Sequence, residues 1–168
     1  MDITSEMGEI LRYLHKKDDY ALFAGFTAYL HTGAEPSPDI DIFVSSLNDV
    51  KEITEDFISK GWIVLHLCDS FSTLEKNGAT FDIIFSKTAE RAFLPCAIKV
   101  PFKDLSLSVI SAEALFLTKM AQVASLERSP EKTARDRRVI HILRQKIDGK
   151  KVKELFQNID DSFCIEGW

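Results

Sequence analysis

The sequence is poor in the residues that mark many common sites. Its three cysteines, Cys68, Cys96 and Cys164, are far apart and odd in number, and they form no CxxC pair and no metal-ligand spacing. We therefore expect free thiols in a reducing cytoplasm rather than a zinc site or a disulfide framework. A GxxxxGKS/T loop and a GxSxG elbow are also missing, so nothing supports a P-loop enzyme or a serine hydrolase.

Long apolar runs are absent too. No run reaches the length needed to cross a bilayer, and the acidic start MDITSEMGEI contains no hydrophobic signal core. We expect a cytoplasmic protein with no membrane partner. The 168 residues are 45% hydrophobic and 28% charged, which is an ordinary globular balance and enough for one domain with a core.

Charge is unevenly distributed along the chain. The net charge is −5, yet residues 119–153 contain eleven Lys or Arg against four Asp or Glu. Two interpretations stay open for this basic segment. Its charges lie on solvated helix faces, or they face an anionic partner such as RNA or another phosphorylated acceptor.

Hydrophobic periodicity predicts alternating strands and helices followed by helices alone. Strands are expected at 20–24, 39–44, 62–67, 71–74, 79–86 and 97–100, with a hairpin turn at Asn77-Gly78. Helices are expected at 3–14, 26–31, 50–58, 112–124, 130–145 and 152–157. The predicted fold is α/β (α+β): a small mixed sheet flanked by helices. Residues 1–109 would form the α/β core, and residues 110–168 a C-terminal helical segment packed on it.

The candidate site rests on three aspartates in apolar strands. Asp39 and Asp41 lie two apart in PDIDIFVSS and so share one face, while Asp82 lies in FDIIF. Alternation alone also fits strands with one wet face, and it does not say whether Asp82 lies beside the pair. If the three converge, burial and repulsion would raise a pKa, and a divalent cation would relieve the repulsion. Mg²⁺ prefers such oxygen ligands.

These motifs resemble the nucleotidyltransferase superfamily related to DNA polymerase beta. The order is Gly25 after a strand, a short helix, DIDIF, and a later strand FDIIF. The segment FAGFTAYLHTGAEPSPDIDIF, followed by ISAEALFLTKMAQ and RSPEKTARDRRVIHIL, is similar to minimal nucleotidyltransferases of toxin–antitoxin type. The resemblance covers roughly residues 20 to 144.

The resemblance implies roles for individual residues. Asp39 and Asp41 would bind Mg²⁺, with a two-ion site possible, and Asp82 would complete the site and help deprotonate an acceptor hydroxyl. Gly25 would let the backbone approach the nucleotide phosphates at a helix N-terminus. Lys119 interrupts an apolar helix, where it would either reach a phosphate or extend to solvent.

Two positions depart from the family pattern. Phe26 replaces the usual Gly or Ser after Gly25, and its ring would either block the phosphates or turn into the core. Glu35-Pro36 stands where an Arg is common, whereas Ser37 matches the family's small hydroxyl residue. The resemblance therefore implies Mg²⁺-dependent transfer of a nucleoside monophosphate from an NTP to a hydroxyl of a protein, an RNA or a small molecule. The alternative is a catalytically idle protein that acts as a binding or toxin–antitoxin partner.

Overall fold

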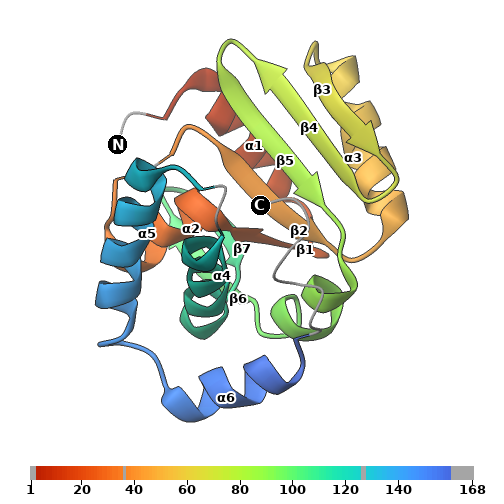
Figure 1. The fold of residues 1–168 in the computed structure, drawn as a ribbon. Helices are drawn as coiled ribbons and strands as arrows, with labels where there is room; N and C mark the ends of the chain where they lie inside the picture. The colour runs from red at the N-terminus through yellow and green to blue at the C-terminus, as the bar shows by residue number, and fades with distance from the viewer. Residues whose placement is uncertain (1–2, 36, 126–127, 160–168) are drawn as a thin grey trace.

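The computed structural model describes residues 3–35, 37–125 and 128–159. These residues form one seven-stranded mixed sheet in the order β3-β4-β5-β2-β1-β7-β6 (Figure 1). The pairs β2–β5 and β1–β7 are parallel, and the other neighbours are antiparallel. The strands are β1 (Tyr20–Phe23), β2 (Ile40–Val44), β3 (Ile63–Cys68), β4 (Phe71–Lys76), β5 (Ala79–Ile84), β6 (Ile98–Phe102) and β7 (Leu105–Val109).

The helices cover the sheet on both sides, as the sequence predicted. They are α1 (Ser5–Leu14), α2 (Ala24–Thr32), α3 (Leu47–Ser59), α4 (Ala112–Ala124), α5 (Pro130–Leu143), α6 (Gly149–Gln157) and a π-helical turn, η1 (Ala89–Phe93). Figure 1 shows α1 and α3 behind the sheet and α2 and α4 in front of it. The predicted fold class is confirmed.

Local signals in the sequence account for most element ends. Ser46 and Ser111 cap α3 and α4, because each side chain accepts the N–H of the third residue after it. Gly33 ends α2 in the left-handed region, with φ of 71°, which a residue with a Cβ adopts at a cost. The hairpin turn at Asn77-Gly78 joins β4 to β5, also with positive φ at both residues.

Some elements differ from the prediction. Helix α2 begins at Ala24, two residues earlier than expected, so Gly25 lies inside its first turn. Strand β7 and the turn η1 were not predicted. The short LSLSV of β7 gains its stability from pairing with β1 and β6, which the local pattern does not reveal.

Two apolar layers enclose the sheet, and the strand β2 contributes to both. Ile40, Ile42 and Val44 face the layer formed with α1 and α3. Phe43 points to the opposite layer, formed with α4, α5 and η1. Side chains alternate along a strand, so Asp41 lies on the same face as Phe43. The central strand that carries the candidate site is therefore buried on both faces.

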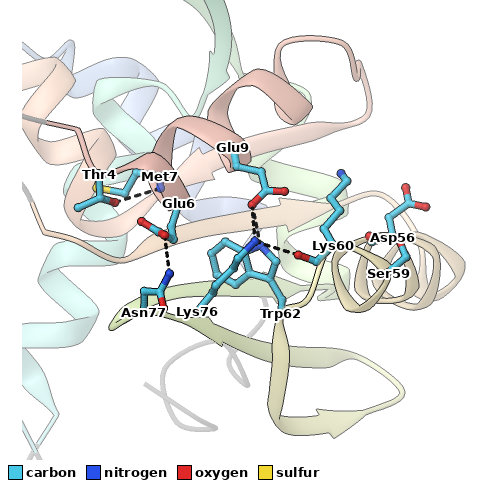
Figure 2. Close-up of polar contacts among 10 residues, drawn as sticks. All are labelled: Thr4, Glu6, Met7, Glu9, Asp56, Ser59, Lys60, Trp62, Lys76 and Asn77. Atoms are coloured by element: carbon cyan, nitrogen blue, oxygen red, sulfur yellow. Dashed lines mark hydrogen bonds and ion pairs between the residues drawn. The ribbon is translucent and has the colours of Figure 1, made fainter.

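A polar cluster fixes the β4–β5 hairpin against α1 (Figure 2). The Glu9 carboxylate accepts hydrogen bonds from Trp62 Nε1 at 3.1 Å and from Lys76 Nζ at 3.2 Å. Lys76 also donates to the Lys60 carbonyl at 2.8 Å, and Asn77 donates to Glu6 at 2.7 Å. These contacts hold the hairpin turn where β5 begins, and thereby help to set the position of Asp82 along the sheet.

Two further predictions concern cysteines and membranes. Cys68 and Cys96 are free thiols, whereas Cys164 lies outside the described residues. Among the described helices, none combines the length and the apolar character that spanning a bilayer requires.

Candidate active site

Strand pairing brings two of the predicted aspartates together. Asp41 on β2 and Asp82 on β5 are direct partners in the parallel pair. Adjacent strands lie about 4.8 Å apart, and direct partners project from the same face. Asp82 therefore lies beside Asp41, whereas the purely structural interpretation of the DxD pattern places it far from the pair.

Asp39 lies one residue before β2, and two hydroxyl groups hold its carboxylate. Ser37 Oγ donates to Asp39 Oδ2 at 2.8 Å, and Thr80 Oγ1 donates to Asp39 Oδ1 at 2.7 Å. Thr80 lies two residues before Asp82 on β5, so it shares the face of that aspartate. The three predicted aspartates thus occupy neighbouring positions on one face of the sheet. Asp39 lies just before β2, Asp41 lies on β2, and Asp82 lies on β5.

Burial and mutual repulsion act on this carboxylate group. Desolvation, together with the charges of Asp82 and Asp39, raises the pKa of Asp41 to about 7, although Lys119 and the Gly25 N–H lower it. Desolvation also raises the pKa of Asp82, against a hydrogen bond from the Thr73 side chain. The buried Asp82 Oδ1 has no hydrogen-bond partner. When the Asp41 and Asp82 carboxylates are ionised, the chain itself therefore supplies too little positive charge and too few hydrogen-bond donors to compensate them.

Gly25 lies where the strand β1 turns into α2. Its N–H hydrogen-bonds to the Asp41 carboxylate. A Cβ at Gly25 would lie 2.8 Å from the Ser37 Cβ, so the close approach of the segment before β2 requires glycine here. The preceding Ala24 has φ of 58°, an unusual left-handed conformation for alanine. A packing reason for Gly25 therefore exists beside the predicted phosphate role.

The side chains of Phe26 and Ser37 take different positions. The Phe26 ring is fully buried in the core and packs edge-on against Phe102, with ring centroids 5.3 Å apart. The ring does not block the site, and only the backbone of Phe26 is available to a ligand. Ser37 is buried as well. It leaves no room for a Cβ at Gly25, and its hydroxyl donates to the Asp39 carboxylate and accepts the Asp39 N–H.

Lys119 belongs to a second buried charged cluster beside the site. Its side chain is 5% exposed, so it is not extended into solvent. Lys119 Nζ contacts Asp136 Oδ1 at 2.8 Å and donates to Gln122 at 2.9 Å, while Arg128 contacts the other oxygen of Asp136. Burial lowers the pKa of Lys119, and Asp136 counters this effect. Lys119 also acts electrostatically on Asp41.

The donor set suits a hard cation, although the side chains do not form a ready-made metal site. In the described part of the chain, no group of three or more His, Cys, Asp or Glu side chains is arranged to hold a metal ion. The chemistry of the donors nevertheless fits Mg²⁺, because carboxylate oxygens are its preferred ligands and Asp82 Oδ1 has no other partner. Mg²⁺ binding by these residues stays a prediction.

Sequence reasoning missed several residues near the site. Thr80 orients Asp39, and alternation along the strand could have identified it, since it shares the face of Asp82. Arg128 completes the cluster around Lys119 and Asp136, and its contact with Asp136 depends on how the segment before α5 packs, which leaves no local signal.

Comparison with known proteins identifies the fold. No protein-family model and no curated protein matches the sequence. Among solved structures, the lincosamide antibiotic adenylyltransferase LnuA, with lincomycin bound, is similar with a TM-score of 0.60 and 20% identity, covering 88% of this chain and 100% of that one.

Two other structures are similar at lower identity. The antibiotic-resistance factor ANT(2'')-Ia has a TM-score of 0.61 and 13% identity, covering 90% of each chain. A nucleotidyltransferase-like protein from Paracoccidioides brasiliensis has a TM-score of 0.59 and 13% identity, covering 92% of this chain and 87% of that one. The predicted fold is thus confirmed: this chain has the nucleotidyltransferase fold.

Proposed function

We propose that the protein is a Mg²⁺-dependent nucleotidyltransferase that transfers a nucleoside monophosphate from an NTP to a hydroxyl group. One observation carries the proposal: Asp41 and Asp82 are direct partners on one sheet face, and a buried oxygen of Asp82 lacks any partner. The cost of two adjacent desolvated carboxylates is difficult to explain unless a cation binds there.

Asp39, Asp41 and Asp82 would hold the metal, whose bound charge would neutralise the phosphates and align them for in-line displacement. Burial raises the pKa of Asp82 above its ordinary value, which makes its carboxylate a better proton acceptor. As the acceptor oxygen bonds to the α-phosphorus, its proton passes to Asp82. The bond to the β-phosphate oxygen breaks, and pyrophosphate leaves.

The start of α2 would bind the phosphates. Its first backbone N–H groups, including that of Phe26, lie at the positive end of the helix dipole. Lys119 is already paired with Asp136, so its contribution would be the electrostatic one it makes at Asp41 rather than a direct phosphate contact. Ser37 would position Asp39 rather than touch the nucleotide.

An assay for transfer of the nucleoside monophosphate identifies the class of acceptor. Because LnuA is by name a lincosamide antibiotic adenylyltransferase and ANT(2'')-Ia an antibiotic-resistance factor, hydroxyl-bearing antibiotics should be tried first, followed by RNA and protein. The experiment supplies each NTP with Mg²⁺ and one acceptor class, and mass spectrometry detects the added nucleoside monophosphate. Transfer that Asp41→Asn abolishes is the expected result.

The second candidate function is that of a catalytically idle binding protein. The exposed Glu35 favours it, because an acidic side chain at this position does not help to bind a triphosphate. Absence of transfer to any acceptor class would favour this alternative. A toxin–antitoxin partner then becomes the leading hypothesis.

A further inference from the structure

One half of the sheet is covered by helices on a single face. Along β4 and β5, buried side chains such as Leu74 and Phe81 alternate with half-buried ones, and the buried ones pack in the layer of α1 and α3. Figure 1 shows no helix in front of β3 and β4. We call the uncovered side of β3, β4 and β5 the open face. It presents Ile63, His66, Phe71, Thr73, Glu75 and Asp82.

A row of polar side chains crosses the open face from the candidate site outward. Asp82 of β5 pairs with Thr73 of β4, and Thr73 pairs with His66 of β3. The Thr73 side chain also hydrogen-bonds to Asp82. Because adjacent strands lie about 4.8 Å apart, His66 lies about 10 Å from Asp82 on the same face. A molecule of that length would contact His66 while it presents a hydroxyl group to Asp82.

An aromatic pair lies at the outer end of this row. The ring centroids of His66 and Phe71 are 5.3 Å apart, and His66 is exposed while Phe71 is half-buried. Ile63 on the same face is 62% exposed. The solvent-facing side of an antiparallel sheet is usually polar, so an apolar surface beside the carboxylates indicates a binding site. Aromatic faces attract both the rings and the ammonium groups of ligands.

The charge of the open face excludes one class of acceptor. Strands β3 and β5 contain no Lys or Arg, and the single lysine of β4, Lys76, projects from the other face, where it pairs with Glu9. RNA binding depends on cationic side chains that contact phosphates, and this face has none. The open face therefore does not suit an RNA acceptor.

Glu75 gives the open face an acidic group that no cation neutralises. Its Oε1 accepts the Gly78 N–H at 2.6 Å, and among the described residues no Lys or Arg forms an ion pair with it. Glu75 lies two residues from Thr73, about 7 Å along β4. A half-buried carboxylate at this distance from the row suits an amine.

We propose that the hydroxyl acceptor is a small, amine-bearing ring compound that binds on the open face, an inference that rests on the proposed function. Its ring would stack on His66 and Phe71, its ammonium group would pair with Glu75, and its hydroxyl would lie at Asp82. These groups lie within about 10 Å of one another, a span that a molecule of two or three rings covers.

Proton NMR of the His66 ring tests binding without any transfer. The chain has four histidines, and His66→Gln identifies the resonance. Kanamycin, a three-ring amino sugar, is the amine probe. Maltotriose, an uncharged three-ring sugar, and a short uridine oligonucleotide are the neutral and anionic controls. With Mg²⁺ and a non-hydrolysable NTP analogue present, only kanamycin should shift the His66 resonance in a saturable way. A similar shift with either control, or no shift with kanamycin, would overturn the proposal.

Glu75→Gln tests the amine contact, because it removes the charge and keeps an oxygen for the Gly78 N–H. Kanamycin should bind at least about tenfold more weakly to this variant. Phe71→Leu, which removes the ring and stays apolar, should weaken binding about fivefold. Glu55→Gln on α3 is the matched control and should bind kanamycin as the parent does. Circular dichroism confirms that each variant is folded. Equal losses for Glu75→Gln and Glu55→Gln would show general charge attraction and overturn the proposal.

The transfer assay separates failure of this proposal from failure of the proposed function. Transfer to RNA or protein that is unaffected by Glu75→Gln would overturn the proposal and leave the nucleotidyltransferase activity intact. Transfer to kanamycin that Glu75→Gln weakens about tenfold supports both. Saturable kanamycin binding at His66 without transfer would contradict the proposed function, and with it the role of the open face as an acceptor site.

Discussion

Two buried charged clusters lie beside each other. One contains paired opposite charges, and the other contains neighbouring charges of the same sign. In the first, Asp136 is paired with both Lys119 and Arg128. In the second, Asp41 and Asp82 face each other across two strands, and an oxygen of Asp82 has no partner. The charges of the first cluster are paired within the chain, although Arg128 Nε and Asp136 Oδ2 have no hydrogen-bond partner. The second would become complete only when it binds a cation.

This difference separates a structural role from a functional one. Lys119 is an internal cation that acts on Asp41, yet its direct contacts are with Asp136 and Gln122. A chain under selection for stability alone gains nothing from leaving adjacent carboxylates uncompensated. Unfavourable electrostatics of this kind are characteristic of binding and catalytic sites.

The largest expected effect comes from breaking the compensated cluster. Asp136→Asn leaves Lys119 and Arg128 without their common counter-charge, so we expect a loss of about 3–5 kcal/mol in the free energy of unfolding. Urea denaturation followed by circular dichroism measures it. Glu131→Gln, on the exposed face of the same helix, is the control and should change stability by less than about 0.5 kcal/mol. A loss below about 1 kcal/mol for Asp136→Asn would show that the pairing is not structural.

A smaller effect is expected from Gly25→Ala. The added Cβ would displace the segment that carries Ser37, and overpacking of this kind costs about 1–3 kcal/mol. Because Ser37 orients Asp39, Mg²⁺ affinity should fall as well. The double variant Gly25→Ala/Ser37→Gly removes the clash and should recover most of the stability but not the affinity. If the single variant is as stable as the parent, the close approach is not a constraint.

Relieving the uncompensated cluster should stabilise the metal-free protein. The pKa of Asp41 is about 7 when folded and lies near its ordinary value of 3.8 when unfolded. The folded state therefore binds more protons between these values, and stability decreases as pH rises from about 4 to 7. Asp41→Asn should remove this decrease and raise the free energy of unfolding at pH 8 by on the order of 2 kcal/mol. Asp104→Asn, at an exposed position, should not, and equal effects of both variants would contradict the prediction.

The smallest effect is that of Mg²⁺ itself. At a concentration ten times its dissociation constant, the ion should stabilise the protein by about 1.4 kcal/mol. The stabilisation should be present at pH 8 and lost at pH 5, where Asp41 is protonated. Thermal melts with and without Mg²⁺ measure it, with Asp82→Asn as the unresponsive control. Equal stabilisation at both pH values would place the ion elsewhere.

Much of the fold could be predicted because its signals are local. Ser46, Ser111 and Gly33 mark helix ends by their own backbone chemistry, and Asn77-Gly78 marks its hairpin. The order of the strands could not be predicted in this way, since β2 pairs with β5, which lies far along the chain. The strand β7 was missed for the same reason.

The same distinction between local signals and long-range pairing applies to the candidate site. The residue types of Asp39, Asp41 and Asp82 were visible in the sequence, but their adjacency depends on the register of two distant strands. Which elements pack together decides three further features: the burial of the Phe26 ring, the pairing of Lys119 with Asp136, and the exposure of β3. Periodicity gives the direction of a side chain but not the group it meets.

Calorimetric titration of non-hydrolysable ATP, CTP, GTP and UTP analogues with Mg²⁺ tests the central claim most directly. The parent protein should bind at least one nucleotide only when Mg²⁺ is present. Asp41→Asn/Asp82→Asn should lose that binding while remaining folded. Metal-independent binding, equal binding by the double variant, or no binding of any nucleotide by folded parent protein would contradict the account.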